Sequence, residues 1–406
     1  MKTLQVGNID TIGGRFNGAD LHRQLLKRGI ESQFCVWTKE TNYKNTWRLT
    51  DFPGRGLLNR AINLVERKLS LHSVLYPFSW QLPFDKRFHS ADIIHYHLIH
   101  TGFFSLSSLP TLSRLKPSVW TLHDPWAMTG HCIHPYKCEK WKTGCGECPR
   151  LNTPISMLKD HTALMWNIKK WAYKNADIDI IVASKWMLNM AKQSPLLSNF
   201  RLHHIPFGID LNVFHPMDKE KAKHILGVKP GSIVLAFRAT SNEFKGLSFI
   251  KHCLHKLKLR QPICLITLHE RGLLDEFIDK YQIIDMGWVS ADKLPIVYNA
   301  CDIFLMPSTA EAFGMTAIEA MACGKPVIVF DDTSLPEVIF APKGGIAVPQ
   351  GDVEGLMHAI ESLIEDSQAR QEIGDSAIEL VRKNYNLETF MERIMELYRE
   401  VIKLRE

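Results

Sequence analysis

Long apolar runs are missing from this sequence of 406 residues. No run approaches the about 18 residues that a membrane-spanning helix needs, so the sequence predicts no such helix. The segment Met1–Gly7 is predicted to lead directly into a strand, with no signal peptide, and we therefore expect a cytoplasmic protein. The net charge of +6 is also low. It is compatible with ligands that carry phosphate or with an anionic membrane surface, but it is too weak to indicate nucleic acid.

Two short motifs of other enzyme classes are missing as well. The segment Gly7–Gly14, which follows the first predicted strand, lacks the Gly-x-Gly-x-x-Gly pattern and so disfavours a nicotinamide-dependent dehydrogenase. No Asp-x-Asp motif stands out as a site for a metal and a diphosphate. We therefore expect no catalytic metal.

Cysteine is sparse over most of the chain, because five of the nine cysteines are dispersed, and this does not indicate a secreted disulfide scaffold. The other four are close together in the sequence, at Cys132, Cys138, Cys145 and Cys148. Their number and density are typical of a tetrahedral zinc site, with a histidine of the same segment as a substitute ligand. Reduced structural thiols and a disulfide are the competing interpretations. We predict a structural Zn²⁺ in a Cys-rich insert over residues 129–149.

The sequence does contain an alternation of strand-like and helix-like segments in both halves. Strand candidates include Ile93–His97 and Val119–Leu122 in the first half, and Ser232–Arg238 and Ile303–Pro307 in the second. Such alternation is typical of parallel sheets that are covered by helices on both faces. Because the two runs are joined near Pro206–Pro216, we predict an α/β fold of two Rossmann-like, doubly wound parallel-sheet domains facing a cleft. Ligands are then expected at the carboxyl ends of the strands.

The predicted domains are residues 1–205 and residues 206–385, followed by a C-terminal helix over residues 386–406. Whether this helix packs back on the first domain is left open. The segment Leu57–Leu69 is amphipathic, with apolar residues on one side and basic residues near the other. Contact with anionic lipid and packing on its own domain both explain this pattern, and we favour packing.

The most informative stretch of the sequence is Glu311–Pro326. The apolar run Asp302–Pro307 before it is a predicted buried strand, and a short polar turn leads into an Ala/Met-rich helix that ends at Gly324. A strand, a turn and a helix N-terminus in this order present backbone N–H groups to an anion. Glu311 in the turn and Glu319 in the helix flank that position. Two carboxylates that accept hydrogen bonds from hydroxyl groups, placed beside a phosphate site, suit the binding of a nucleotide sugar.

Two cations and a histidine follow other predicted strands. Arg238 ends a strand, and Lys245 lies in the loop before the next helix. Two cations at such a site can neutralise a diphosphate and stabilise it as a leaving group. His123 follows the strand Val119–Leu122 and precedes Asp124, which favours a place in the active site. Surface cations and a structural histidine are the competing, less favoured interpretations.

These motifs together resemble those of the retaining family-4 glycosyltransferases of the GT-B fold, and the resemblance spans nearly the whole chain. The residues that carry it are Gly13-Gly14, His123-Asp124, Arg238 with Lys245-Gly246, and Glu311 with Glu319. The resemblance implies that Arg238 and Lys245 hold the donor diphosphate and that Glu319 accepts hydrogen bonds from the ribose. The first domain is then the acceptor side, and the second binds the nucleotide sugar.

The resemblance also implies the remaining contacts. Glu311 is implied near the hydroxyls of the donor sugar, and His123 is implied to hydrogen-bond that sugar rather than to act as a general base. Gly13 and Gly14 are implied to approach the diphosphate or the acceptor. No carboxylate is a convincing nucleophile for a covalent intermediate, and the family is described as using front-face attack. The backbone amides that are implied to meet the sugar and the phosphates belong to Phe313, Gly314, Met315 and Thr316.

A narrower resemblance is carried by Thr121–Trp126, Thr129–Cys132 and Trp141–Pro149, which are similar to the subgroup that builds bacterial exopolysaccharides of the colanic-acid type. It implies transfer of a sugar from a UDP- or GDP-sugar to a lipid-linked saccharide in cell-surface polysaccharide biosynthesis, at the inner face of the cell membrane. A nucleotide-sugar epimerase of the same two-domain architecture is the alternative, which the paired glutamates and the two cations disfavour. A carbohydrate-binding subunit without activity is also disfavoured, because every expected charged group is present.

Overall fold

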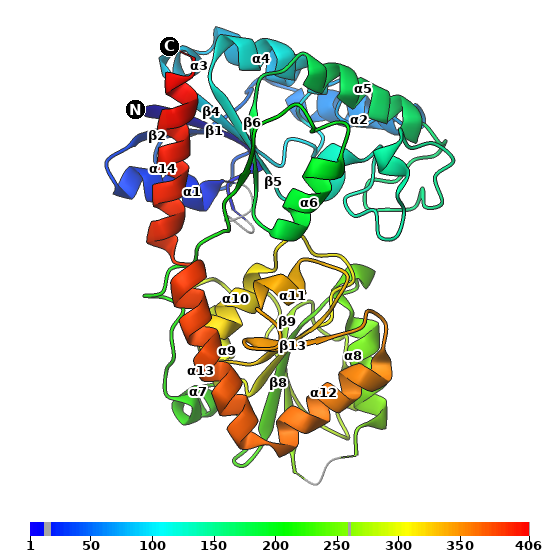
Figure 1. Ribbon diagram of the computed structural model, residues 1–406, viewed down its shortest axis with the longest axis vertical. Coiled ribbons are helices and arrows are strands. Elements are labelled where there is room, and N and C mark those ends of the chain that lie inside the picture. The colour runs from blue at the N-terminus through cyan, green and yellow to red at the C-terminus, as the bar shows by residue number, and fades with distance from the viewer. Residues whose placement is uncertain (12–17, 259–260, 406) are drawn as a thin grey trace. The chain divides into compact units, whose positions relative to one another are not determined.

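The computed structural model describes residues 1–11, 18–258 and 261–405, which form two compact units (Figure 1). Unit 1 consists of Met1–Ile205 together with Met391–Glu406, and unit 2 consists of Pro206–Phe390. Each unit is built on one parallel sheet. This confirms the predicted α/β fold with two Rossmann-like, doubly wound domains.

The sheet of unit 1 consists of β1 (Lys2–Ile9), β2 (Glu31–Thr38), β3 (Thr46–Arg48), β4 (Ile93–His97), β5 (Ser118–Leu122), β6 (Asp179–Val182) and β7 (Leu202–His204). These strands lie in the order β3-β2-β1-β4-β5-β6-β7. Every residue of β4 and β5 is buried, as expected of strands covered on both faces. The direction of winding reverses between β1 and β4, and doubly wound sheets bind ligands at the carboxyl edge beside such a point.

The α-helices of unit 1 are α1 (Ala19–Lys27), α2 (Arg55–Lys68), α3 (Lys86–Ser90), α4 (Leu109–Leu115), α5 (Thr162–Lys174), α6 (Lys185–Gln193) and most of α14 (Leu387–Lys403). Its 3₁₀ turns are η1 (Phe78–Phe84), η2 (Leu106–Ser108), η3 (Pro125–Met128) and η4 (Lys140–Lys142). The terminal helix is tied to the sheet, because the Tyr398 hydroxyl lies 2.6 Å from Nδ1 of His95 and accepts a hydrogen bond from Gln5 at 3.2 Å. Just beyond α14, Arg405 donates to the carbonyl oxygen of Ser113 at 2.6 Å.

The sheet of unit 2 consists of β8 (Ile233–Ala239), β9 (Ile263–His269), β10 (Gln282–Asp285), β11 (Ile303–Met306), β12 (Val327–Phe330) and β13 (Gly345–Val348). Its strands lie in the order β10-β9-β8-β11-β12-β13. The chain first adds strands on one side of β8 and then returns to add them on the other side. The reversal therefore lies between β8 and β11.

The helices of unit 2 are α7 (Lys219–Leu226), α8 (Leu247–Lys256), α9 (Leu294–Ala300), α10 (Met315–Ala322), α11 (Leu335–Val338), α12 (Val353–Glu365) and α13 (Ser367–Asn384), with 3₁₀ turns η5 (Glu243–Lys245) and η6 (Asp275–Phe277). Its core joins the sheet to two of these helices. Leu235 and Leu305 of the sheet belong to one buried cluster with Ile250 of α8 and Ile360 of α12. This packing fixes the carboxyl ends of β8 and β11 beside each other.

The sequence patterns did not predict four short strands of three or four residues, β3, β7, β10 and β13. They are the two edge strands of each sheet, where the partial exposure of the side chains weakens the apolar pattern. The helix α13, which precedes the predicted C-terminal helix, was not predicted either. No helix among the described residues is both long enough and apolar enough to cross a membrane.

The helix α2 does not pack its apolar residues on unit 1. Of the predicted apolar side, Leu58, Val65 and Leu69 are 42%, 45% and 49% exposed and Ile62 is half-buried, whereas Glu66 is the one residue of the helix that is buried. The favoured interpretation of this amphipathic segment, packing on its own domain, is therefore wrong. The helix is turned so that its acid faces the unit and its leucines face solvent.

Candidate functional site

The predicted donor residues of unit 2 gather at the carboxyl edge of its sheet, where the winding reverses. Arg238 is the penultimate residue of β8, and Glu311 lies in the turn that follows β11. Because β8 and β11 are hydrogen-bonded neighbours, their carboxyl ends meet at one place. The order of the strands thus brings together residues that are more than 70 positions apart in the sequence.

The turn that carries Lys245 is fixed against the end of β11. Gly246 has a φ of 76°, in the left-handed region, and a Cβ atom at this position would collide with the carbonyl oxygen of Pro307. The neighbouring Thr309 N–H donates to the carbonyl oxygen of Phe244 at 2.9 Å. Only glycine fits so close an approach with this backbone conformation. The Lys-Gly pair therefore holds the lysine at the reversal point.

Lys245 and Glu311 form an ion pair in this position. The Lys245 Nζ donates to Oε2 of Glu311 at 2.8 Å, with 21% and 15% of the two side chains exposed. The carbonyl oxygen of Glu311 accepts hydrogen bonds from both the N–H and the hydroxyl of Ser334, at 3.3 and 3.1 Å. Burial lowers the pKa of Arg238, and the nearby Glu311 acts in the opposite direction. Arg238 and Lys245 thus place two positive charges beside the Glu311 carboxylate at the reversal point, where a bound anion can interact with both.

The turn then opens into α10 through Gly314, whose φ is 97°. No side chain caps the N-terminus of this helix with a hydrogen bond. Phe313 and Met315 on either side are only 3% and 2% exposed, so what they can offer a ligand is their backbone. The Thr316 hydroxyl lies 3.4 Å from the sulfur of Met306. A helix N-terminus beside two cations is suited to binding phosphate.

Glu319 lies deeper than the other predicted donor residues. Its side chain is fully buried, and its Oε2 accepts a hydrogen bond from the Tyr298 hydroxyl of α9 at 2.8 Å. A ribose hydroxyl that binds this carboxylate would have to share or replace the bond from Tyr298. Tyr298 is thus a member of the site that sequence reasoning missed, since an apolar helix without a motif gave no signal for it.

Sequence reasoning also missed His269 and Glu270 at the carboxyl end of β9. His269 has a φ of 96°. Residues other than glycine rarely adopt this backbone conformation, and those that do are concentrated at functional sites. The hydrogen bonds from Thr240 and Ser241 lower the pKa of Glu270 to about 2, so this carboxylate is charged. Two polar residues directly after a buried strand were the available signal. Both interact electrostatically with Arg238.

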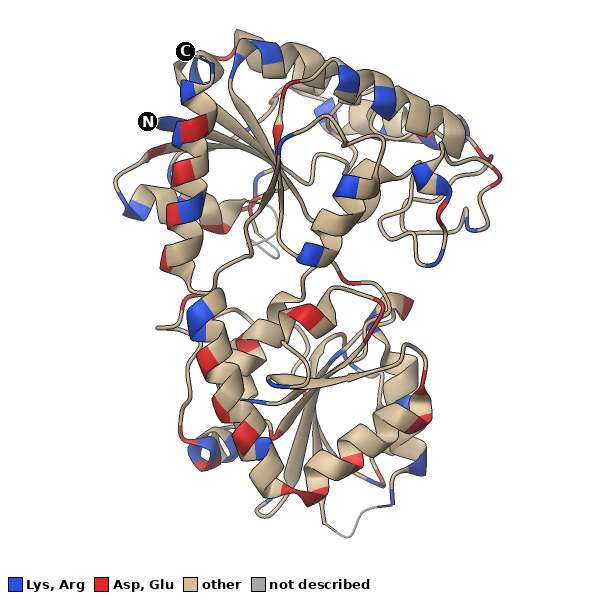
Figure 2. Ribbon diagram, viewed as in Figure 1, with Lys and Arg blue, Asp and Glu red and all other residues tan. Residues whose placement is uncertain are grey.

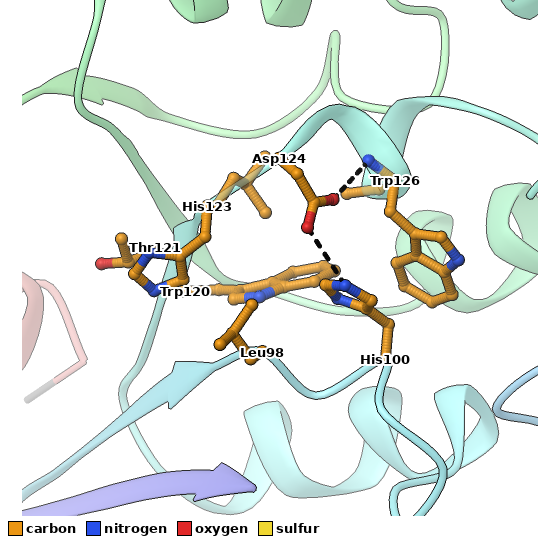
Figure 3. A pocket seen from close by; sticks show the side chains of 9 residues that line it. Leu98, His100, Trp120, Thr121, His123, Asp124 and Trp126 are labelled. Atoms are coloured by element: carbon orange, nitrogen blue, oxygen red, sulfur yellow. Dashed lines mark hydrogen bonds and ion pairs between the residues drawn. The ribbon is translucent and has the colours of Figure 1, made fainter. Parts of the chain in front are cut away.

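In unit 1, His123 lines a small pocket at the carboxyl end of β5 (Figure 3). Its ring lies with its centroid 5.7 Å from that of His97, and both of its ring nitrogens are buried. Burial lowers the pKa of His123 to about 3, although the neighbouring Asp124 acts in the opposite direction. The imidazole is therefore neutral at physiological pH. The other residues that line the pocket are Leu98, His100, Trp120, Thr121, Leu122, Asp124, Trp126 and Ala127.

Asp124 closes the opposite side of this pocket. Its carboxylate accepts the N–H of Trp126 at 2.8 Å and lies 3.1 Å from Nε2 of His100, contacts that Figure 3 shows as dashed lines. Burial alone would raise the pKa of Asp124, but the His100 ring and the Trp126 N–H lower it below its ordinary value. The pocket thus holds a fixed carboxylate and, in His123, a neutral imidazole, which suits hydrogen bonding to hydroxyl groups.

The histidines of β4 belong to a buried network below this pocket. Nε2 of His95 lies 2.6 Å from the Thr121 hydroxyl, and Nε2 of His97 lies 3.0 Å from Oε1 of Gln5. Burial lowers the pKa of both histidines, that of His95 to about 3. This network joins β1, β4 and β5 to Tyr398 of α14. The two side chains serve the packing of unit 1.

The four cysteines of the predicted zinc site are free thiols. The Gly130 N–H donates to the sulfur of Cys145 at 3.2 Å, and Nε2 of His131 lies 3.4 Å from the sulfur of Cys148. Throughout the described residues, however, no three His, Cys, Asp or Glu side chains are arranged so that they could hold a metal ion. Zinc binding by Cys132, Cys138, Cys145 and Cys148 stays a prediction.

The two remaining sequence features are the predicted glycine pair and an acidic run before β6. Gly13 and Gly14 lie outside the described residues. The run Asp177–Asp179 has the spacing of an Asp-x-Asp motif, but its carboxylates are paired with Arg201 at 3.2 and 2.7 Å. Asp179 is also the first residue of β6, at the edge of the sheet opposite to the ligand-binding one. These carboxylates are therefore structural.

Two family models match the chain, one in each half. Residues 19–213 match the model described as Glycosyltransferase Family 4, and residues 218–380 match the model described as Glycosyl transferases group 1. Among curated relatives, the D-inositol 3-phosphate glycosyltransferase of Paenarthrobacter aurescens is 30% identical over 186 residues, which are 43% of this chain and 46% of that protein. The chain thus spans about half the length of this relative.

Two solved structures resemble the chain over their whole length. The sucrose-phosphate synthase of Thermosynechococcus elongatus has a TM-score of 0.71 at 18% identity and covers 100% of both chains. HepE of Anabaena, in complex with UDP-glucose, has a TM-score of 0.68 at 17% identity over 98% of this chain and 100% of that chain. At these identities the likeness shows the fold.

Proposed function

We propose that this chain, which has the GT-B fold and whose two halves match the models of Glycosyltransferase Family 4 and Glycosyl transferases group 1, transfers a sugar from a nucleotide diphosphate sugar to a saccharide acceptor with retention of configuration. The observation that carries the proposal is the cluster of Arg238, Lys245 and Glu311 at the reversal point of unit 2. A sugar–phosphate bond breaks most easily when the departing diphosphate meets fixed positive charge. Arg238 and Lys245 supply that charge at a position where doubly wound sheets bind ligands.

The other residues of unit 2 then divide the donor between them. The N–H groups at the start of α10 hold the phosphates, and Glu319 accepts hydrogen bonds from the ribose. Glu311 orients Lys245 through their 2.8 Å bond and accepts hydrogen bonds from the donor sugar. The UDP-glucose bound to HepE supports a uridine or a similar nucleotide as the donor class.

In the proposed reaction His123 contacts the donor sugar as a hydrogen-bonding group. A neutral imidazole, with a pKa of about 3, is too weak a base to take a proton from an acceptor hydroxyl. The oxygen of the departing phosphate is the group that takes this proton in front-face attack, the mechanism adopted here from the family resemblance. The acceptor is proposed to be a lipid-linked saccharide of a bacterial cell-surface polysaccharide, which the motifs Thr121–Trp126 and Trp141–Pro149 support.

A screen of nucleotide sugars tests the proposal. Purified protein is heated with each UDP- and GDP-sugar, and its melting temperature and the slow hydrolysis of the donor are recorded. We expect one nucleotide class to stabilise the protein, because a ligand that binds only the folded state raises the melting temperature. The same donor should be hydrolysed slowly without acceptor. Rapid formation of an epimer without acceptor would instead identify an epimerase, and an absence of any binding would overturn the proposal.

A structural zinc ion in the Cys-rich insert remains a second, smaller proposal. The Gly130 N–H bond to Cys145 and the contact of His131 with Cys148 support a thiolate cluster. So does the buried Lys169, whose charge interacts with the thiols of Cys132 and Cys145. Binding requires the thiols to turn toward a common centre. Metal analysis of protein without a polyhistidine tag should find about one zinc per chain, and less than about a tenth of an equivalent would contradict it.

A further inference from the structure

We propose that an exposed face of unit 1 docks on an anionic lipid surface. This face, the α2 face, consists of Leu57, Leu58, Leu64, Val65 and Leu69, with the cations Arg60, Arg67 and Lys68 beside them. It contributes no residue to the donor site described above. The inference rests on the proposed function in one respect: the proposed lipid-linked acceptor lies in a membrane.

The apolar side chains of the α2 face point away from the unit. Leu57, Leu64 and Leu69 are 71%, 55% and 49% exposed. Residues 57, 64 and 68 recur at intervals that place them on one side of a helix, opposite residue 66. Glu66 on that opposite side is buried, and its carboxylate accepts the N–H groups of Ser73 and Val74 at 2.9 and 2.7 Å. The helix is thus anchored through its acid, and its leucines remain available for a partner.

The exposed charged residues of this helix are all basic. Its single acidic residue is the buried Glu66, whereas Arg60, Arg67 and Lys68 are exposed and take part in no ion pair with the described residues. The nearest acid before the helix, Asp51, lies 3.4 Å from Arg48. Exposed leucines interspersed with cations that lack acidic neighbours are the pattern of a helix that lies in the interface of an anionic membrane.

A second helix of unit 1, α5, has a similar composition at its surface. The end of α2 is bonded to the segment before α5, because the Lys159 N–H donates to the Ser70 hydroxyl at 2.8 Å and His161 lies 2.8 Å from the carbonyl oxygen of Leu69. The helix α5 has no acidic residue, and it exposes Leu164 and Trp171 by 47% and 55%. Lys170 and Lys174 are exposed on it as well. Figure 2 shows basic positions along this helix, which Figure 1 labels α5.

The positive charge of this face favours an anionic lipid surface over a second copy of the chain as its partner. A second copy of the chain would bring the same three cations, Arg60, Arg67 and Lys68, against their own counterparts. Residues 1–205 carry 27 Lys and Arg against 14 Asp and Glu, a net charge of +13. A surface of anionic head groups over apolar tails matches both the sign of this charge and the leucines.

Vesicle flotation of the full-length protein tests the proposal without any sugar donor. We expect binding to phosphatidylcholine vesicles that contain about 30 mol% phosphatidylglycerol, weaker binding to phosphatidylcholine alone, and a loss of binding with rising salt. Leu57→Ser with Leu64→Ser should weaken binding at least about tenfold, since two leucines leave the apolar phase. Arg60→Glu with Arg67→Glu should do so to a similar extent.

Two matched variants serve as controls. Ile225 and Ile278 of unit 2 are both 64% exposed, so Ile225→Ser with Ile278→Ser removes similar apolar side chains elsewhere. Arg399→Glu with Lys403→Glu makes the same charge change on α14 of unit 1. Both controls should change binding by less than about twofold.

Three results would overturn the proposal. The first is no binding of the wild-type protein to anionic vesicles, and the second is equal binding by the α2-face variants and their controls. The third is a dimer in solution that Leu57→Ser with Leu64→Ser abolishes while vesicle binding is absent, which would assign the face to a second copy. Because donor hydrolysis is measured separately, a failure of vesicle binding and a failure of the proposed transfer are distinguishable.

Discussion

The two units share a sheet architecture but differ in charge (Figure 2). Residues 1–205 carry 27 Lys and Arg against 14 Asp and Glu, a net +13, and residues 391–406 add four of each sign. Residues 206–390 carry 18 against 25, a net −7. The overall charge of +6 therefore conceals a basic unit and an acidic one. Whole-chain charge was a poor guide to the partners of this protein, because it averages over two surfaces of opposite sign.

The candidate sites do not follow this distribution of charge. The acidic unit 2 gathers Arg238 and Lys245 at its reversal point, whereas the basic unit 1 has the neutral His123 in its pocket. We interpret unit 2 as the holder of an anionic donor, and unit 1 as a membrane-facing unit with a pocket for hydroxyl groups.

Removing the cations of unit 2 should have the largest effect on the rate of sugar transfer. Arg238→Ala and Lys245→Ala should each lower the rate of sugar transfer by about 10²- to 10³-fold, because the departing diphosphate loses fixed positive charge. Lys251→Ala is the matched control, since Lys251 forms an ion pair of 2.7 Å with Glu276 on the same unit. The measurement is kcat with saturating donor. Equal losses in Lys245→Ala and Lys251→Ala would show that only the fold is affected.

His123 in unit 1 should have a smaller effect that does not depend on pH. His123→Asn should lower kcat/KM about tenfold or more through the loss of a hydrogen bond to the sugar. Because burial lowers the pKa of His123 to about 3, wild-type and variant should have pH profiles of the same shape between about pH 5 and 8. The exposed His358→Asn is the control. An inflection between about pH 6 and 7 that only His123→Asn removes would identify the histidine as an acid or base.

Acid should destabilise unit 1 before unit 2. Burial lowers the pKa of His72, His95 and His123 to about 3 and that of His97 well below its ordinary value, and all four lie in unit 1. For a base whose folded pKa is lowered, the unfolded chain binds the proton first. The stability is therefore fully present above about pH 6.5 and is lost as the pH falls toward about 3.

Hydrogen exchange read out by mass spectrometry can separate the two units. Between pH 7 and pH 5, and after correction for intrinsic exchange, protection should fall in peptides of β4 and β5 and remain in those of β8 and β11. The apparent melting temperature of unit 1 should drop by roughly 10 °C. A parallel loss of protection in both units would contradict the assignment of the acid sensitivity to the buried histidines.

The smallest effect on activity is expected from a change at Tyr298, which tests whether Glu319 binds the ribose. Tyr298→Phe removes the hydroxyl that donates to Glu319 at 2.8 Å. It should raise the KM for the donor about threefold to tenfold, with kcat little changed, because the carboxylate is less well held for the ribose. A change confined to kcat would place Glu319 on the reacting side of the donor instead.

Sequence patterns predicted the sheets because their central strands are largely apolar and buried, as in Val119–Leu122 and Ile303–Pro307. They failed at the four edge strands, where exposure dilutes that signal. The meeting of Arg238, Lys245 and Glu311 was predicted from the rule that carboxyl ends of parallel strands converge. Tyr298 and the strained His269 could not be predicted, since no spacing encodes a contact between helices or a positive φ at a strand end.

The α2 helix shows a different limit of sequence reasoning. Its apolar periodicity was recognised, but periodicity does not tell which side of a helix faces the protein. The decisive feature is Glu66, whose carboxylate accepts three backbone N–H groups, those of Ser73, Val74 and Leu75. A single buried acid with such partners turned the leucines outward.

Calorimetric titration with the nucleoside diphosphate that the donor screen selects tests the central claim most directly. The claim is that the reversal point of unit 2 binds the donor diphosphate through Arg238 and Lys245. We expect Arg238→Ala with Lys245→Ala to weaken binding at least about 100-fold and Lys251→Ala to leave it unchanged. Equal affinities of the double variant and the wild-type protein would contradict it.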